Sequence, residues 1–138
     1  IALNSAFAAT ASKDFVIKRY SSIEKIESVP FIVESLPKKT KELIIMVKSI
    51  FKGFSNLAFK KKVIRAGKGK QRGRKYKSNA GVLIVTSKDE NAKLKGFDIK
   101  SLEEIRIVDL YPLGRLTIYT QKALEELGKE KMEEENDP

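Results

Sequence analysis

The stretch Gly81-Val82-Leu83-Ile84-Val85-Thr86 decides the fold of this chain. It is a nearly continuous apolar run, and such runs are typical of a central strand that is buried on both faces of a parallel sheet. Three further segments have the composition of strands, namely Val29–Val33, Ile105–Leu110 and Leu116–Tyr119. The sequence therefore predicts an α/β fold with a layered, mostly parallel sheet of about four strands.

Helices are expected on either side of these strands. The segments with helical character are Ile1–Ser12, Pro37–Phe51, Asp89–Lys95 and the stretch that follows Thr120. Asp14–Tyr20 either continues the first helix or begins a connection. Thr120 can cap the last helix, because a threonine side chain accepts hydrogen bonds from first-turn amides. Strands alternating with helices indicate a sheet covered by helices.

The composition excludes several classes of protein. The 138 residues can form one domain with a substantial core, and 33% of them are charged. Because Cys and His are both absent, the chain has no disulfide, no Cys/His zinc site and no histidine-based catalytic dyad. No apolar run approaches the roughly 18 residues that a membrane span needs. We therefore expect no metal, cofactor, small-molecule substrate or membrane partner.

The charge of +10 is unevenly distributed along the chain. The first 124 residues carry 26 basic and 11 acidic side chains, whereas the residues from Glu125 onward carry 7 acidic and 2 basic ones. A basic body favours a polyanionic partner. We expect one domain over residues 1–128, with an acidic, disordered tail over residues 129–138. The alanine-rich start indicates a helix whose upstream sequence has been cut away.

The segment Lys60–Lys77, KKKVIRAGKGKQRGRKYK, is the main functional candidate. It holds ten basic residues, three glycines and no acidic residue, without a helical or strand period, so we expect a long basic loop. Glycines let the backbone approach a phosphate, arginines can bond two oxygens at once, and Tyr76 can stack on an unpaired base. The positions expected to contact RNA are Lys60, Lys61, Lys62, Arg65, Gly67, Lys68, Gly69, Lys70, Arg72, Gly73, Arg74, Lys75, Tyr76 and Lys77.

The basic segment is open to three other interpretations. A localisation signal or a disordered basic tail is the simplest, although apolar elements flank the segment on both sides. A nucleotide-binding loop does not fit, because Arg72 stands where a dinucleotide motif needs its third glycine, and no Gly-Lys pair precedes Ser or Thr. Membrane attachment would need apolar anchors on an amphipathic helix. Nucleic-acid binding is therefore the favoured interpretation.

Four further positions are candidates for RNA contact. Lys39, Thr40 and Lys41 lie at an expected helix start, where they either form a solvated first turn or bind a phosphate. Arg115 follows the turn marked by Pro112 and Gly114, and is either a solvated turn residue or an RNA contact. We expect Tyr111 and Tyr119, together with Phe7, Phe31, Phe51 and Phe54, to serve packing.

The run Ile64–Lys77 closely resembles the signature of the archaeal and eukaryotic family of large-subunit ribosomal protein four. The resemblance extends over essentially the whole chain, in the order of the family. Its other matching segments are Ile1–Ala11, Pro30–Val33 followed by Lys39–Glu42, Gly81–Val85, and Gly114–Thr120 with Ala123 and Leu124. Two connections, Tyr111–Arg115 and Leu94–Asp98, are shorter than is usual in the family.

The resemblance implies a non-catalytic, structural protein of the cytoplasmic ribosome. Its partners would be large-subunit ribosomal RNA and neighbouring large-subunit proteins. The family's exit-tunnel loop belongs to an N-terminal half that this chain lacks, so no tunnel-lining residue is assigned. A messenger-RNA regulator remains compatible with this interpretation. The rival is a nucleic-acid-processing enzyme or accessory domain of α/β type. For such an enzyme, Asp89, Glu90, Asp98 and Asp109 lie near expected strand ends without forming a motif.

Overall fold

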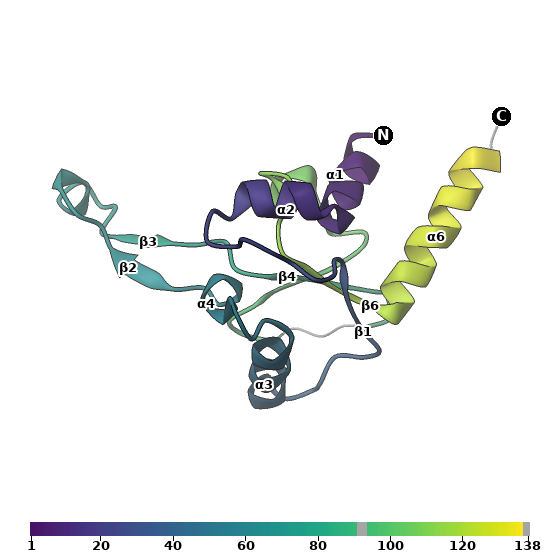
Figure 1. Ribbon diagram of the computed structural model, residues 1–138, viewed down its shortest axis with the longest axis horizontal. Helices are drawn as coiled ribbons and strands as arrows, with labels where there is room; N and C mark the ends of the chain where they lie inside the picture. The colour runs from purple at the N-terminus through teal and green to yellow at the C-terminus, as the bar shows by residue number, and fades with distance from the viewer. Residues whose placement is uncertain (91–93, 137–138) are drawn as a thin grey trace.

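The computed structural model of the chain describes residues 1–90 and 94–136, with side chains described as far as residue 129. Its main sheet contains β1 (Phe31–Val33), β6 (Thr117–Thr120), β4 (Leu83–Thr86) and β5 (Asp98–Ser101), in that spatial order. All three strand pairs are parallel. The expected α/β fold with a four-stranded parallel sheet is therefore confirmed (Figure 1).

β4 and β6 occupy the centre of the sheet, and every residue of both strands is buried. They pair directly, with Leu83 opposite Thr117 and Ile84 opposite Ile118. β1 and β5 form the two edges and are only partly buried. The continuous apolar run of β4 thus has the place that its composition predicts, because a central strand covered on both faces has no solvent side.

One expected strand is a helix. Ile107–Leu110 forms the short helix α5, and the second edge of the sheet is formed by β5 instead. The backbone amide of Arg106 donates to the Asp109 carboxylate at 3.0 Å, which closes the first turn of α5. Val108 is 80% exposed, so the apolar run does not mark a buried strand. The edge strand β5 was missed because its sequence, Asp-Ile-Lys-Ser, is mostly polar.

The two faces of the sheet are covered by different helices (Figure 1). Ile84 and Ile118 pack in one apolar cluster with residues of α3 (Thr40–Ile50) and α4 (Ser55–Ala58). Leu83 and Tyr119 pack in a second cluster with residues of α1 (Ala2–Ala11), α5 and α6 (Gln121–Asn136). Neighbouring residues separate in this way because successive side chains of a strand point to opposite faces.

The helices differ from expectation mainly at their boundaries. Lys13–Arg19 forms a separate helix, α2, and α3 begins at Thr40 rather than at Pro37. The expected helix Asp89–Lys95 falls partly on residues 91–93, outside the described residues, and its described positions are not helical. Thr120 caps α6 as expected, with its Oγ1 accepting the Ala123 amide at 3.4 Å. α6 then continues as helix to residue 136, through most of the expected tail.

The aromatic residues follow the expectation with one exception. Phe7, Phe51 and Tyr119 are buried, and Phe31 and Phe54 are half-buried against them or their neighbours. The Tyr119 hydroxyl lies 2.7 Å from the Thr10 Oγ1, and its burial raises the pKa of Tyr119. Tyr111, expected to pack, is 71% exposed, because its turn lies outside the core.

Candidate nucleic-acid interface

The basic segment forms a β-hairpin rather than an irregular loop. β2 (Lys62–Ile64) and β3 (Tyr76–Ser78) pair antiparallel, with Lys62 opposite Ser78 and Ile64 opposite Tyr76. We call residues 60–80 the basic hairpin; it extends away from the body of the protein (Figure 1). Both of its faces are exposed, so neither face requires apolar residues. This is why its sequence lacks the alternation that would have predicted strands.

Two glycines shape the tip of the hairpin. Gly67 and Gly73 have φ values of 89° and 75°, in the left-handed region that favours glycine, on either side of the short 3-10 helix η1 (Lys68–Lys70). The backbone amides of residues 70, 71, 72 and 74 donate to carbonyls inside the tip. These four amides are therefore occupied by hydrogen bonds within the tip. The side chains of the tip carry its positive charge outward.

All ten basic residues of the hairpin are exposed. Lys60 pairs with Asp98, and the Lys61 Nζ donates to the Asn56 side chain at 2.8 Å. The root of the hairpin, where it joins the body at residues 60 and 61, therefore has polar partners. Farther out, the amino groups of Lys62 and Lys75 lie 5.2 Å and 5.6 Å from the centre of the Tyr76 ring. Tyr76, which is 49% exposed, combines a stacking surface with two neighbouring cations.

Asn79 fixes the root of the hairpin and was not singled out from the sequence. Its Oδ1 accepts the Lys61 amide at 2.8 Å, and its Nδ2 donates to the Phe59 carbonyl at 2.9 Å. The side chain thereby joins the incoming and outgoing strands where the sheet ends. An asparagine near a strand end is common in turns, so the sequence held no specific signal for this role.

Arg115 is a structural residue of the hairpin root, and the structure does not support the expected RNA contact there. It is only 4% exposed. Its guanidinium donates to the Gly81 carbonyl at 3.1 Å, the Ala80 carbonyl at 2.9 Å and the Asp109 carbonyl at 2.7 Å. These bonds turn the planar fork inward onto the chain. We therefore leave Arg115 out of the proposed RNA-binding surface.

Lys39, Thr40 and Lys41 lie at the start of α3, as expected, with Lys39 as the N-cap residue. The two lysines are exposed, and the Lys39 amino group lies 3.9 Å from the Glu42 carboxylate. The other end of α3 leads through α4 to β2, so this helix start is separated from the hairpin by the length of α3 (Figure 1). The structure thus presents two separate basic surfaces.

Two of the four acidic residues of the rival interpretation, Asp98 and Asp109, are held by cations. Asp98 binds Arg115 and Lys60, and the Asp109 carboxylate accepts the Lys100 Nζ at 2.7 Å. Burial alone would raise the pKa of Asp98, but hydrogen bonds from Lys60 and Arg115 hold that pKa below its usual value. Within residues 1–90 and 94–129, no group of three or more acidic side chains is placed to hold a metal ion. Nor is any helix of the described part long and apolar enough to cross a membrane.

Comparison with known proteins places the chain in a family. The family model described as ribosomal protein L4/L1 matches residues 1–130. "Large ribosomal subunit protein uL4" of Methanosphaera stadtmanae is 37% identical over 144 residues, covering 93% of this chain and 54% of the relative. The protein of the same name from Methanocaldococcus jannaschii is 38% identical, covering 96% of this chain and 56% of the relative.

A third relative with this name, from Thermoplasma volcanium, is 40% identical over 89% of this chain and 52% of its own length. The chain thus spans about half the length of the curated relatives it matches. The match includes the sheet, its helices and the basic hairpin, since the family model extends over residues 1–130. This chain belongs to the ribosomal protein L4/L1 family.

Proposed function

We propose that this chain is a structural, non-catalytic protein of the large ribosomal subunit that binds ribosomal RNA through its basic hairpin. The observation that carries the proposal is the hairpin itself. Ten exposed cations stand on a projecting two-stranded ribbon without an acidic residue among them. Such a density of like charge is self-repelling unless an anionic partner neutralises it.

The geometry supports RNA as that partner. The tip displays the side chains of residues 68, 70, 72 and 74 around two glycine turns, while several of its amides are already bonded internally. Lysine and arginine side chains can neutralise phosphates from such a projection, and arginine can also bond a base edge. Tyr76 adds an exposed ring on which an unpaired base could stack.

The start of α3 is the second proposed contact. Lys39 and Lys41, on either side of Thr40, expose cations at a helix N-terminus, where backbone amides favour a phosphate. Because this surface is separate from the hairpin, we infer that the two bind different RNA segments. The relatives' names support large-subunit RNA and large-subunit proteins as partners on the ribosome. We further propose that residues 1–128 act as one RNA-binding domain.

A hairpin-deletion variant tests the proposal. Replacing residues 65–75 with Asn-Gly would join Ile64 to Tyr76, which already face each other in the β2–β3 ladder, through a two-residue turn. The variant and the unchanged chain are compared for binding to large-subunit ribosomal RNA and to random RNA of equal length. We expect the deletion to weaken binding to ribosomal RNA at least about 100-fold at moderate salt, because it removes six cations. Unchanged affinity in a folded deletion variant would reject the hairpin as the main contact.

A further inference from the structure

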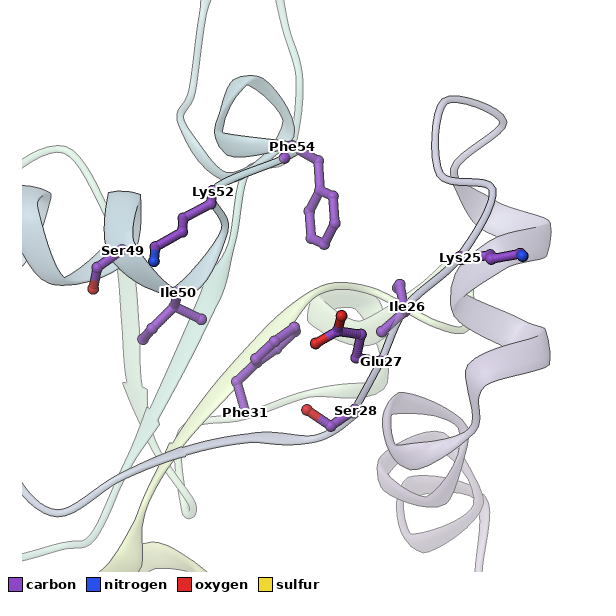
Figure 2. A pocket seen from close by; sticks show the side chains of 10 residues that line it. Lys25, Ile26, Glu27, Ser28, Phe31, Ser49, Ile50, Lys52 and Phe54 are labelled. Atoms are coloured by element: carbon purple, nitrogen blue, oxygen red, sulfur yellow. The ribbon is translucent and has the colours of Figure 1, made fainter.

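A cleft of about 450 Å³ lies between the end of α3 and the segment that precedes β1. Its walls include the side chains of Phe31, Phe54, Ile26 and Ile50 (Figure 2). The ring of Phe31 extends from the β1 side and the ring of Phe54 from the α4 side, and both point into the cleft. A volume of this size lies within the range of small-molecule pockets in proteins.

The two rings are braced rather than loose. Phe51, which is fully buried, packs against both of them. Its ring centre is 4.6 Å from that of Phe31, nearly edge to face, and 5.9 Å from that of Phe54. Edge-to-face contacts of this kind fix ring orientation. The half-buried rings therefore offer a preformed apolar surface, which reduces the entropy lost when a planar group stacks on them.

The charges around the cleft distinguish its interior from its rim. In Figure 2 the Glu27 carboxylate is turned toward Phe31, whereas the amino group of Lys25 points away from the rings. Lys52 extends along Ile50 on the other side. A carboxylate on the wall disfavours a phosphate inside the cleft, while lysines on the rim favour phosphates outside it. This arrangement suits an uncharged base with its backbone at the rim.

The cleft also lies next to the proposed RNA-binding hairpin in the chain. Phe54 is the N-cap residue of α4, and this single-turn helix leads directly to Lys60 and β2. Phe54 and Lys60 are thus separated by only a few residues of the protein chain. A strand of RNA held at the root of the hairpin would therefore pass close to the cleft. Unpaired bases of RNA are commonly bound by stacking on aromatic side chains.

We propose that this cleft, the phenylalanine cleft, binds one unpaired nucleobase of the RNA that the basic hairpin holds. The base stacks between Phe31 and Phe54, and its flanking phosphates lie near Lys25 and Lys52. The proposal rests on the proposed RNA-binding function and adds a base-specific site to a contact that is otherwise electrostatic.

Gly53 provides a variant that blocks the cleft without removing a packed side chain. It lines the cleft, and a Cβ built on it meets nothing within 4 Å. Gly53→Leu should therefore fill the cleft and leave the core intact. Gly128→Leu is the matched control, because Gly128 on α6 has equally open surroundings. Thermal unfolding of both variants verifies that they fold.

The probes are a pentamer of adenylate, rA5, and a pentamer of the same charge with an abasic central ribose. Backbone amide resonances of the full 138-residue chain are followed by NMR during titration at low salt. We expect rA5 to shift the amide signals of Gly53 and Phe54, and the abasic pentamer to shift them much less. Gly53→Leu should weaken rA5 binding about 5- to 100-fold, the range expected for loss of one stacked base. Gly128→Leu should bind like the unchanged chain.

Two outcomes would overturn the inference. Equal shifts with rA5 and the abasic pentamer would mean that the cleft region senses only phosphate. Equal affinity of Gly53→Leu and the unchanged chain would mean that no base enters the cleft. In both cases hairpin signals that respond to rA5 would leave the proposed RNA-binding function standing. If neither the hairpin nor the cleft signals respond to rA5 or to large-subunit RNA, the proposed function itself fails.

Discussion

The Arg115 guanidinium lies 2.7 Å from the Asp98 carboxylate, and this ion pair joins the entry of β6 to the edge strand β5. The Arg115 side chain is 5% exposed and the Asp98 side chain 32% exposed. Asp98 also binds Lys60, the first residue of the basic hairpin. A mostly buried cation in the body thus holds the root of the proposed RNA-binding element.

Arg115→Gln should destabilise the chain by about 3 kcal/mol or more, since removing one partner of a buried ion pair leaves polar groups unpaired. Three carbonyls and Asp98 lose their donors in this variant. Urea unfolding in the absence of RNA measures the effect. Arg106→Gln is the control, because Arg106 is exposed and should change stability by less than about 0.5 kcal/mol. Equal stability of the two variants would contradict the anchoring role of Arg115.

Gly114→Ala should be among the most damaging single-methyl substitutions in this fold. A Cβ at Gly114 would lie 2.3 Å from the Phe15 carbonyl oxygen, and φ is +86°. We expect a loss of roughly 3 kcal/mol from the left-handed backbone and the clash together.

Gly96→Ala isolates the backbone component of this loss. Gly96 has φ of +98°, but a Cβ there meets nothing within 4 Å. The variant should lose only about 1 to 2 kcal/mol. If thermal unfolding shows equal losses at both glycines, the close approach of Phe15 to Gly114 is not a constraint.

Stability should fall in acid because two carboxylates have depressed pKa values. Burial opposes the depression at Asp98 and Asp109, but bonds from Lys60 and Arg115, and from Lys100, lower the pKa of each carboxyl. A folded pKa below the unfolded value of about 3.9 means that the stabilisation is complete above that pH and is lost as pH falls through the folded pKa. Asp98→Asn should flatten the acid limb of the stability curve below about pH 4. An unchanged limb would mean that Asp98 carries no linked proton.

Charge and geometry in the hairpin tip can be separated by paired substitutions. Lys68→Ala with Lys70→Ala removes about two phosphate contacts. The plot of log RNA affinity against log salt concentration should therefore become less steep, by about 0.7 to 0.9 per contact, for most RNAs alike. Arg72→Lys with Arg74→Lys keeps the charge but removes the planar fork. That variant should keep the slope and lose preference for large-subunit RNA over random RNA. Equal effects of both pairs on affinity, without a change in preference, would make the tip an electrostatic contact only.

Deleting residues 129–138 should leave RNA affinity unchanged or slightly stronger. The segment carries 5 acidic and 2 basic residues, so its removal raises the net charge from +10 to +13. The structure continues α6 to residue 136, so the deletion removes the last part of this helix and no strand of the sheet. A large loss of RNA binding on deletion would show that these residues make a contact of their own.

The strongest elements of the fold could be predicted from local sequence. The run of β4 specified a buried central strand, and the spacing around Leu43 and Val47 specified the covering helix α3, because each signal lies within one segment. The basic hairpin was located correctly by its charge, but its strands were not, since a ribbon exposed on both faces needs no apolar alternation.

The sequence by itself determined that this chain forms a parallel α/β sheet and carries one dense basic segment, because apolar runs and net charge are properties of contiguous residues. Only the tertiary structure decided which cations remain available to a partner. Arg115 is turned inward by the carbonyls of Ala80 and Gly81, more than 30 residues away in sequence, whereas the tip cations stay exposed. A side chain's exposure depends on which distant segments pack around it, and the pairing of β4 with β5 and β6 sets those neighbours.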